Sequence, residues 1–467
     1  MFRRTADRLS TGVEGLDRIL CGGLLRPSSY LLAGGPGTGK TVLGSQMAFK
    51  LASLGQDILF ISVLTEPYSH LLWNISTFSF FDEARINKQI TFVSAFSTLE
   101  AQGLSGLEEM MRLSLPGSGA ALVILDNIGM LSGYAGTPLD YRAFLQKTIS
   151  LSTMSGATVV ASTDRPISTA ATEYGSFDGV IELRQCRRGM RTFRTLEVLK
   201  SRGSFHLEGE HAFEIGLDGL VVYPRLEVGW KGRPPDLYWP GSLSWGIPGL
   251  DEMTGGGVGR GTVTALVGPT GAGKTTFCMS FAGEGIQRGE KVLFVSHHES
   301  PRRLMEAAKG VGLDLDLGLR TGLFETMWLP PGEDYIDRMA DEVLKRLDRR
   351  PVTRLILDGS DSMRRLSLFR HRFAVFMAIF CDQLRGRGVT TLLTTGEAPR
   401  NGRIADEGLP WSSIDNILHI LYDADAVPPR KVVHVAKTRG RGHGPSAGEL
   451  EITESGVRIV PLPTPQS

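Results

Sequence analysis

The sequence contains the same glycine-rich pattern twice, in residues 34–41 (GGPGTGKT) and 268–275 (GPTGAGKT). Both fit G-x-x-x-x-G-K-[ST]. Glycines let backbone amides converge on phosphate oxygens, the lysine reaches the β- and γ-phosphates, and the hydroxyl is a ligand for Mg²⁺. Two copies in matching surroundings predict two sites for Mg·ATP. The expected nucleotide contacts are Gly35, Pro36, Gly37, Thr38, Gly39, Lys40 and Thr41 in the first loop and Pro269, Thr270, Gly271, Ala272, Gly273, Lys274, Thr275 and Thr276 in the second.

A chain of 467 residues is too long for one hydrophobic core, so two or three domains are expected. Its 51 Lys and Arg residues balance 50 Asp and Glu residues, which predicts no bulk attraction to nucleic acid or anionic lipid. The four cysteines include no C-x-x-C pair, which argues against a metal or disulfide framework. No apolar run approaches the length of a membrane span, and the N-terminus lacks a secretory signal pattern. A cytoplasmic protein is therefore expected.

Other features repeat at nearly the same offset as the two loops. Residues 11–17 (TGVEGLD) correspond to 245–251 (WGIPGLD), and each loop is followed by a helix-length stretch, residues 41–54 and 275–288. Apolar strands are expected at 30–33, 58–62, 121–126 and 157–162, and again at 264–267, 292–296, 354–358 and 389–395. Apolar strands alternating with helices predict an α/β fold with mostly parallel sheets flanked by helices. The long period predicts two duplicated domains, residues 1–228 and 229–467.

Each half has an aspartate at the end of an apolar strand, Asp126 in the first and Asp358 in the second. A carboxylate at this position can hold Mg²⁺ together with the threonine of the phosphate loop, Thr41 or Thr275. The alternative is an ordinary aspartate in a turn. The phosphate loops upstream favour the metal role.

Hydrolysis also needs a group that activates or positions the attacking water. The strand after the first helix ends in Leu64-Thr65-Glu66-Pro67 in one half and in His297-His298-Glu299-Ser300-Pro301 in the other. Ligands collect at the carboxyl ends of parallel strands, so Glu66 and Glu299 are candidate catalytic bases. The alternative is an acid that interacts with the N-terminus of the next helix.

A basic segment that contains glycine lies near the end of each half. These segments are residues 200–206 (KSRGSFH) and 437–443 (KTRGRGH), and each follows an apolar strand, 196–199 or 432–436. A lysine and an arginine two positions apart on a strand point to the same side and can meet one anion. Lys200, Arg202, Lys437 and Arg439 are therefore candidate phosphate sensors. A solvated basic turn is the alternative for either segment alone.

This ordered set of features resembles the KaiC-like branch of the RecA superfamily. The resemblance rests on residues 11–17, both phosphate loops, the glutamates at the strand tips, both strand-end aspartates and the Lys-x-Arg-Gly segments. The run 200–206, continued by 209–215 (GEHAFEI) and 222–225 (VYPR), is particularly characteristic. The resemblance covers nearly the whole chain and implies two tandem RecA-like P-loop NTPase domains.

The resemblance also implies an assembly. Members of this family form double-ring homo-hexamers with ATP at the subunit interfaces, so Lys200, Arg202, Lys437 and Arg439 would reach the γ-phosphate held by a neighbouring subunit. Activity would then depend on assembly. A role in signalling or circadian-type timing, with clock or signalling proteins as partners, is expected on the same basis.

Family members also act as Ser/Thr autokinases on adjacent hydroxyl residues of the second domain. Ser412 and Ser413 fall near that place and are candidate phosphoacceptors. The family typically has paired glutamates at the strand tip, whereas His298 and either Leu64 or Thr65 occupy the first of the two places here. Loss of one carboxylate is expected either to remove kinase activity or to shift the chemistry toward plain hydrolysis.

Two other classes of function remain open at this point. A DNA-binding RecA-like motor or recombinase would use the arginines that follow the second strand-end aspartate, with Phe369 or Phe373 stacking on bases. These arginines are Arg364, Arg365, Arg370, Arg372, Arg385, Arg387, Arg400 and Arg403. A nucleotide-regulated scaffold would bind ATP in both halves and hydrolyse little.

Overall fold

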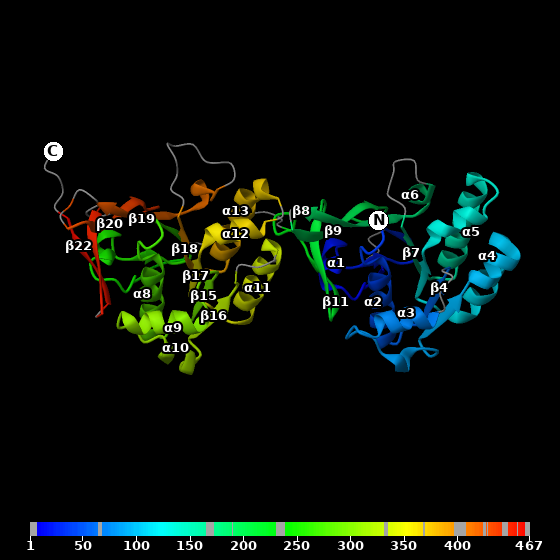
Figure 1. Cartoon of the computed structure of the whole chain (residues 1–467), viewed down its shortest axis with the longest axis horizontal. Helices are drawn as coiled ribbons and strands as arrows, with labels where there is room; N and C mark the ends of the chain where they lie inside the picture. Colours follow the sequence, from blue (N-terminus) through cyan, green and yellow to red (C-terminus); the bar gives the residue numbers. More distant parts are fainter. Residues whose placement is uncertain are drawn as a thin grey trace. The chain divides into compact units, whose positions relative to one another are not determined.

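The computed structural model describes residues 7–63, 68–164, 172–188, 190–229, 239–330, 335–367, 369–396, 408–423, 426, 428–440, 447–454 and 456–462. The chain divides into two compact units, Met1–Gly229 and Trp230–Ser467 (Figure 1). The domain boundary between residues 228 and 229 stays a prediction. No described helix combines the length and the apolar composition that crossing a bilayer requires.

The first unit is built on one nine-stranded sheet. In spatial order its strands are β11 (Gly219–Tyr223), β10 (His211–Gly216), β9 (Arg191–Ser201), β8 (Gly179–Arg188), β3 (Ser29–Ala33), β7 (Thr158–Thr163), β6 (Leu122–Asp126), β4 (Ile58–Ser62) and β5 (Ile90–Ser94). The strands from β8 to β5 are parallel, and β9, β10 and β11 continue the sheet in antiparallel fashion. A short two-stranded antiparallel sheet of β1 (Arg8–Leu9) and β2 (Leu24–Leu25) lies outside this sheet.

Helices cover both faces of this sheet. Figure 1 shows α1, α2 and α3 on one side of the strands and α4 and α5 on the other. The helices are α1 (Glu14–Ile19), α2 (Lys40–Ser53), α3 (Tyr68–Ile75), α4 (Phe96–Ser118), α5 (Pro138–Met154) and α6 (Thr172–Ser176), with 3₁₀ turns η1 (Glu83–Arg85) and η2 (Ile128–Tyr134). Every residue of β3, β4, β6 and β7 is buried, which explains why these strands are continuous apolar runs.

The second unit repeats this plan. Its strands, in spatial order, are β16 (Phe324–Trp328), β15 (Val292–Ser296), β17 (Arg354–Asp358), β18 (Thr390–Thr395), β14 (Val263–Val267), β19 (Asn416–Asp423), β20 (Arg430–Lys437), β21 (Ala447–Thr453) and β22 (Gly456–Pro461). Strands β16 to β19 are parallel and β20 to β22 antiparallel. The two-stranded sheet of β12 (Ser242–Leu243) and β13 (Val258–Gly259) corresponds to that of β1 and β2.

The helices of the second unit also form two layers. Figure 1 shows α8, α9 and α10 on one side of the sheet and α11, α12 and α13 on the other. The helices are α7 (Leu250–Met253), α8 (Lys274–Gln287), α9 (Pro301–Gly310), α10 (Asp316–Thr321), α11 (Ile336–Arg349), α12 (Ser360–Leu366) and α13 (Phe373–Gly386), with 3₁₀ turns η3 (Arg370–Arg372) and η4 (Trp411–Ser413). The expected α/β class, with mostly parallel sheets flanked by helices, is confirmed. The antiparallel strands that extend each sheet were not predicted from the sequence.

Candidate nucleotide-binding sites

Each glycine-rich loop joins the central strand of its sheet to a helix. The first loop follows β3 and leads into α2, and the second follows β14 and leads into α8. Gly39 and Gly273 precede these helices with φ angles of 104° and 101°, a conformation that L side chains rarely adopt. A Cβ at either position would lie 2.6 Å from the Cδ1 atom of an isoleucine, Ile215 or Ile452. Glycine is therefore required at both positions.

The loops present unpaired backbone donors. Among the described residues, the amides of Gly37, Thr38 and Gly39 donate no hydrogen bond, and neither do those of Gly271 and Gly273. Amides that converge at the N-terminus of a helix form a binding site for an anion such as a phosphate group. The geometry of both loops therefore fits a nucleotide triphosphate chain.

The loop lysines fold back over their own loops. Lys40 Nζ donates to the carbonyl oxygens of Gly34 and Gly35 at 2.8 and 2.9 Å. Lys274 Nζ donates to those of Gly268 and Pro269 at 2.6 and 2.9 Å. Partial burial lowers the pKa of both lysines, and nearby carboxylates oppose this shift. Each ammonium group thus lies beside the unpaired loop amides.

The strand-end aspartates lie next to the loop threonines. Thr275 Oγ1 donates to Asp358 Oδ2 at 2.9 Å, and Thr41 Oγ1 lies 3.3 Å from Asp126 Oδ2. Both carboxylates are only 3% exposed. Burial raises the pKa of Asp126, while its hydrogen bonds from Ser162 and Thr41 oppose the rise.

A second hydroxyl orients each carboxylate. Ser162 Oγ donates to Asp126 Oδ1 at 2.6 Å, and Thr394 Oγ1 donates to Asp358 Oδ1 at 2.7 Å. The donor set of each site is a carboxylate and a hydroxyl, which are the oxygen ligands that Mg²⁺ prefers beside phosphate oxygens. The residues present therefore fit an ATP-bound Mg²⁺ ion.

Glu299 lies close to the second site, just beyond the end of β15. Ser296, the last residue of β15, pairs in register with Asp358, and its hydroxyl accepts a hydrogen bond from the backbone amide of Glu299 at 2.9 Å. The preceding His298 is exposed and lies 3.2 Å from Ser362 Oγ, while His297 is buried. Glu66, its expected counterpart, lies outside the described residues.

The basic segments have the same arrangement in both units. Lys200 Nζ donates to the carbonyl oxygens of Tyr174 and Phe177 at 3.0 and 2.6 Å. Arg202 is 62% exposed and lies 3.9 Å from Asp178. The lysine and the arginine were expected to project together from one strand. Instead the lysine binds α6 and the residue that follows it, Phe177, whereas the arginine extends into solvent.

The second unit repeats these contacts. Lys437 Nζ donates to the carbonyl oxygens of Trp411 and Ile414 at 3.2 and 2.5 Å. Arg439 is 65% exposed and lies 3.2 Å from Asp415. Partial burial and the neighbouring arginines lower the pKa of Lys200 and of Lys437.

The family of the chain is identified by comparison with known proteins. A family model described as "ATPase: KaiC" matches the chain twice, over residues 9–227 and 243–464. The chain belongs to the KaiC family of ATPases. The expected resemblance is therefore confirmed, and nucleotide binding follows from the family.

Similar proteins cover almost the entire chain. The circadian clock oscillator protein KaiC of Prochlorococcus marinus (strain MIT 9313) is 26% identical over 97% of this chain and 92% of its own length. The proteins of the same name from Picosynechococcus sp. and Thermostichus vulcanus are each 26% identical over 97% of this chain and 89% of their own length.

The candidate phosphoacceptors of this KaiC-family chain lie beside the second basic segment. Ser412 and Ser413 occupy η4, between Trp411 and Ile414, the two residues whose carbonyl oxygens bind Lys437. Ser412 is exposed and Ser413 is half-buried. Because Lys200 binds Tyr174 and Phe177 in the same way, the matching residues of the first domain are Gly175 and Ser176. The serine pair is thus specific to the second domain.

Two further residues contact the second loop. Tyr422 Oη donates to the carbonyl oxygen of Gly271 at 3.0 Å, and Lys431 Nζ donates to the same oxygen at 3.0 Å. These residues face each other across β19 and β20. Neither residue could be predicted from the sequence, because the contacts join positions 151 and 160 residues apart and no motif marks either residue.

The arginines considered for DNA binding are partly engaged in ion pairs. Arg372 is buried and binds Asp337 through two hydrogen bonds of 2.8 and 2.7 Å. Arg387 binds Asp348, and Arg385 binds Asp415. Phe373 is 2% exposed, so the expectation that it stacks on bases is wrong. Arg400 and Arg403 lie outside the described residues.

Proposed function

We propose that the protein hydrolyses ATP at both phosphate loops, at the interfaces between the subunits of a double-ring homo-hexamer. Lys40 and Lys274 bind the β- and γ-phosphates, and the unpaired loop amides surround the same oxygens. Thr41 with Asp126, and Thr275 with Asp358, would hold a Mg²⁺ ion, which would supply positive charge beside the phosphate oxygens.

One observation carries the proposal that each site needs a second subunit. Asp415 binds Arg439 and also accepts a hydrogen bond from the backbone amide of Val263, the first residue of β14. Lys274 belongs to the loop after the last residue of β14. Strands rise about 3.3 Å per residue, so the five residues of β14 separate the two groups by roughly 13 Å.

The first domain supports the same reasoning. Asp178, the partner of Arg202, accepts a hydrogen bond from the backbone amide of Ser29, the first residue of β3. Lys40 belongs to the loop after the other end of β3. Each exposed arginine therefore lies at the amino end of the central strand, whereas the phosphate loop of the same domain follows the carboxyl end of that strand. The arginine is too far away to reach the γ-phosphate bound by its own domain. We assign Arg202 and Arg439, with Lys200 and Lys437 as residues that position the arginine segments, to the site of a neighbouring subunit.

Glu299 is the proposed base of the second site. Its hydrogen-bonded position at the tip of β15 places it next to the strand that ends in Asp358. From there it accepts the proton of the attacking water, while the neighbouring arginine stabilises negative charge in the transition state. Glu66 has the same proposed role in the first domain.

We further propose that the second domain phosphorylates Ser412 or Ser413. These serines share a loop with the carbonyl oxygens that hold Lys437, so a subunit that presents Arg439 to its neighbour's ATP presents the serines to the same site. Since the similar proteins are named circadian clock oscillator proteins, we propose that ATP turnover serves timing or signalling through partner proteins.

Incubation of the full-length protein with ATP labelled on its γ-phosphate tests this function. We expect ATP-dependent assembly into hexamers, released phosphate and labelled protein. Glu299→Gln is expected to lower turnover at the second site about 100-fold while ATP still binds. Glu306→Gln, an exposed residue on α9, is the matched control. Unchanged turnover in Glu299→Gln would remove Glu299 from the mechanism, and a monomer without affinity for Mg·ATP would contradict the whole proposal.

A further inference from the structure

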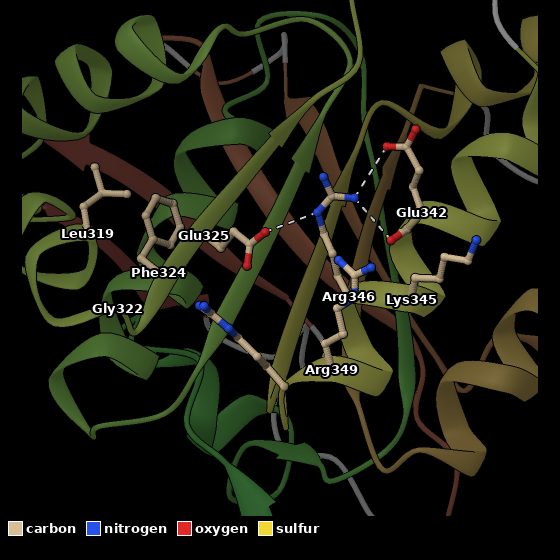
Figure 2. A pocket seen from close by; sticks show the side chains of 9 residues that line it. Leu319, Gly322, Phe324, Glu325, Glu342, Lys345, Arg346 and Arg349 are labelled. Atoms are coloured by element: carbon tan, nitrogen blue, oxygen red, sulfur yellow. Dashed lines mark hydrogen bonds and ion pairs between the residues drawn. The ribbon is translucent and has the colours of Figure 1, made fainter. Parts of the chain in front are cut away.

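A cleft of about 700 Å³ lies at one edge of the second domain's sheet. Leu319 of α10 and Phe324 of β16 line one side, and Arg346 and Arg349 of α11 line the other, as Figure 2 shows. The cleft is at the amino end of β16, whereas the glycine-rich loop follows the carboxyl end of β14, a parallel strand of the same sheet. It is therefore separate from the nucleotide site.

Strand β16 is the last strand of its sheet, and only β15 pairs with it within the described ranges. The backbone of Leu323 and that of Leu329 hydrogen-bond with β15, through Val292 and Ser296 respectively. Backbone groups alternate in direction along a strand, so those of Phe324, Thr326 and Trp328 point away from β15. A row of strand donors and acceptors thus faces away from the sheet, and the cleft adjoins the amino end of this row at Phe324.

The cations of the cleft differ in how they are neutralised. Arg346 Nε donates to Glu325 Oε1 at 3.2 Å, and Arg346 Nη1 donates to the carbonyl oxygen of Glu342 at 3.2 Å (Figure 2). Arg349 and Arg350 are exposed and form no ion pair with any residue that the structure describes. Two guanidinium groups that have no carboxylate partner among the described residues therefore line the cleft at the amino end of β16.

The fold itself does not require these cations. The first domain has the same sheet order and the same kind of edge strand, β5. Its helix α4, which also follows the edge strand, has no basic residue in its last turn, whereas α11 ends with Arg346 and Arg349. Interaction with the C-terminal end of a helix dipole is therefore not a general need at this position.

We propose that this cleft binds an extended acidic segment of a partner protein. The segment adds as a strand to the free edge of β16, and its carboxylates bind Arg349 and Arg350. Backbone hydrogen bonds supply affinity in this mode of recognition, and side-chain contacts supply specificity. Arginine matches the geometry of a carboxylate with two parallel hydrogen bonds, which favours an acidic sequence.

The test uses full-length protein with saturating Mg·ATP, so that the nucleotide loops do not compete for the probe. The probe is a fluorescein-labelled peptide in which glutamate alternates with valine over about seven residues. Binding is measured by fluorescence anisotropy, and hydrogen exchange is followed at the amides of Phe324, Thr326 and Trp328. We expect saturable binding and slower exchange at these three amides.

Two double variants have the same change in net charge. Arg349→Glu with Arg350→Glu is expected to weaken binding of the glutamate–valine peptide at least about tenfold. Lys88→Glu with Arg142→Glu, both exposed residues of the first domain, is expected to leave it unchanged. A peptide with proline at alternate positions keeps its charge but cannot pair as a strand.

Three outcomes would overturn the proposal. The first is no binding of the glutamate–valine peptide. The second is equal binding of the proline-containing peptide. The third is equal or tighter binding of single-stranded DNA of the same charge, which would show a general polyanion surface instead of a site for a strand.

Discussion

Lys274 and Arg439 lie at opposite ends of the same strand, β14. Lys274 folds over the loop after its last residue, and Arg439 binds Asp415, which is hydrogen-bonded to its first residue. One chain therefore carries both of the groups that we propose act on the transferring phosphate, and it holds them at opposite ends of β14. This separation leads to the expectation that catalysis depends on contacts between subunits.

The loop lysines are expected to be essential. Lys40→Ala and Lys274→Ala should each remove the turnover of one domain, and the double variant should lose at least about 100-fold of the total rate, since these two lysines carry the ammonium groups that fold back over the phosphate loops. Phosphate release at saturating Mg·ATP measures this. Lys88→Ala, on the exposed surface, serves as the control. A double variant with the original rate would exclude both loops as catalytic sites.

Autophosphorylation is expected only in the second domain. Ser412→Ala combined with Ser413→Ala should abolish protein labelling from γ-labelled ATP, because these hydroxyls lie beside Lys437. Ser176→Ala changes the matching position of the first domain and should leave labelling intact. Mass spectrometry of the labelled peptide identifies the acceptor. Label in Ser176, or undiminished label in the double variant, would refute the assignment.

Arg372 is expected to support the fold instead of binding DNA. Its side chain is 9% exposed and its partner Asp337 is 2% exposed, so Arg372→Ala removes the guanidinium group that binds a buried carboxylate. We expect a loss of about 3 kcal/mol in the unfolding free energy of the second domain. Arg365→Ala, at an exposed position, should change this free energy by less than about 0.5 kcal/mol. Denaturant unfolding followed by circular dichroism compares them, and equal stabilities would contradict the pairing.

Thiol reactivity should distinguish the four cysteines. Cys21 is exposed, whereas burial raises the pKa of Cys381 to about 12. At about pH 8 the Cys381 thiol therefore stays protonated and unreactive, and Cys21 reacts first with a thiol reagent. Because the pKa of Cys381 is higher in the folded than in the unfolded state, its protonated thiol contributes to stability below the unfolded pKa of about 8.5. This contribution to the unfolding free energy is lost as the pH rises toward 12. Rapid labelling of native Cys381 would contradict its burial.

The sequence predicted those parts of the molecule that depend on local pattern. The expected strands at 58–62 and 292–296 coincide with β4 and β15, because their residues are apolar, β-branched and bounded by turns. The aspartates at 126 and 358 end buried strands as expected. Short patterns of this kind report burial directly, so they need no information about distant residues.

Contacts between distant residues could not be predicted in this way. Nothing in the sequence near Tyr422 or Lys431 indicates that both donate to Gly271, since only the pairing of β19 with β14 and β20 brings them there. The same holds for Lys200, whose carbonyl partners precede β8. The spacing of Lys200 and Arg202 predicted that both side chains point to the same side of the strand. The lysine instead donates hydrogen bonds to the carbonyl oxygens of Tyr174 and Phe177.

Mixing of inactive subunits tests the central claim most directly. Lys274→Ala removes the proposed phosphate contact of the second domain, and Arg439→Ala removes the cation that we propose one subunit contributes to the site of the next. With Lys40→Ala present in both chains to silence the first domain, each variant alone should be inactive. Mixed in equal amounts, they should regain part of the second-domain rate, because some interfaces combine an intact Lys274 with a neighbour's intact Arg439. No recovery in hexamers shown to contain both chains, or full activity of the Arg439→Ala variant alone, would contradict the account.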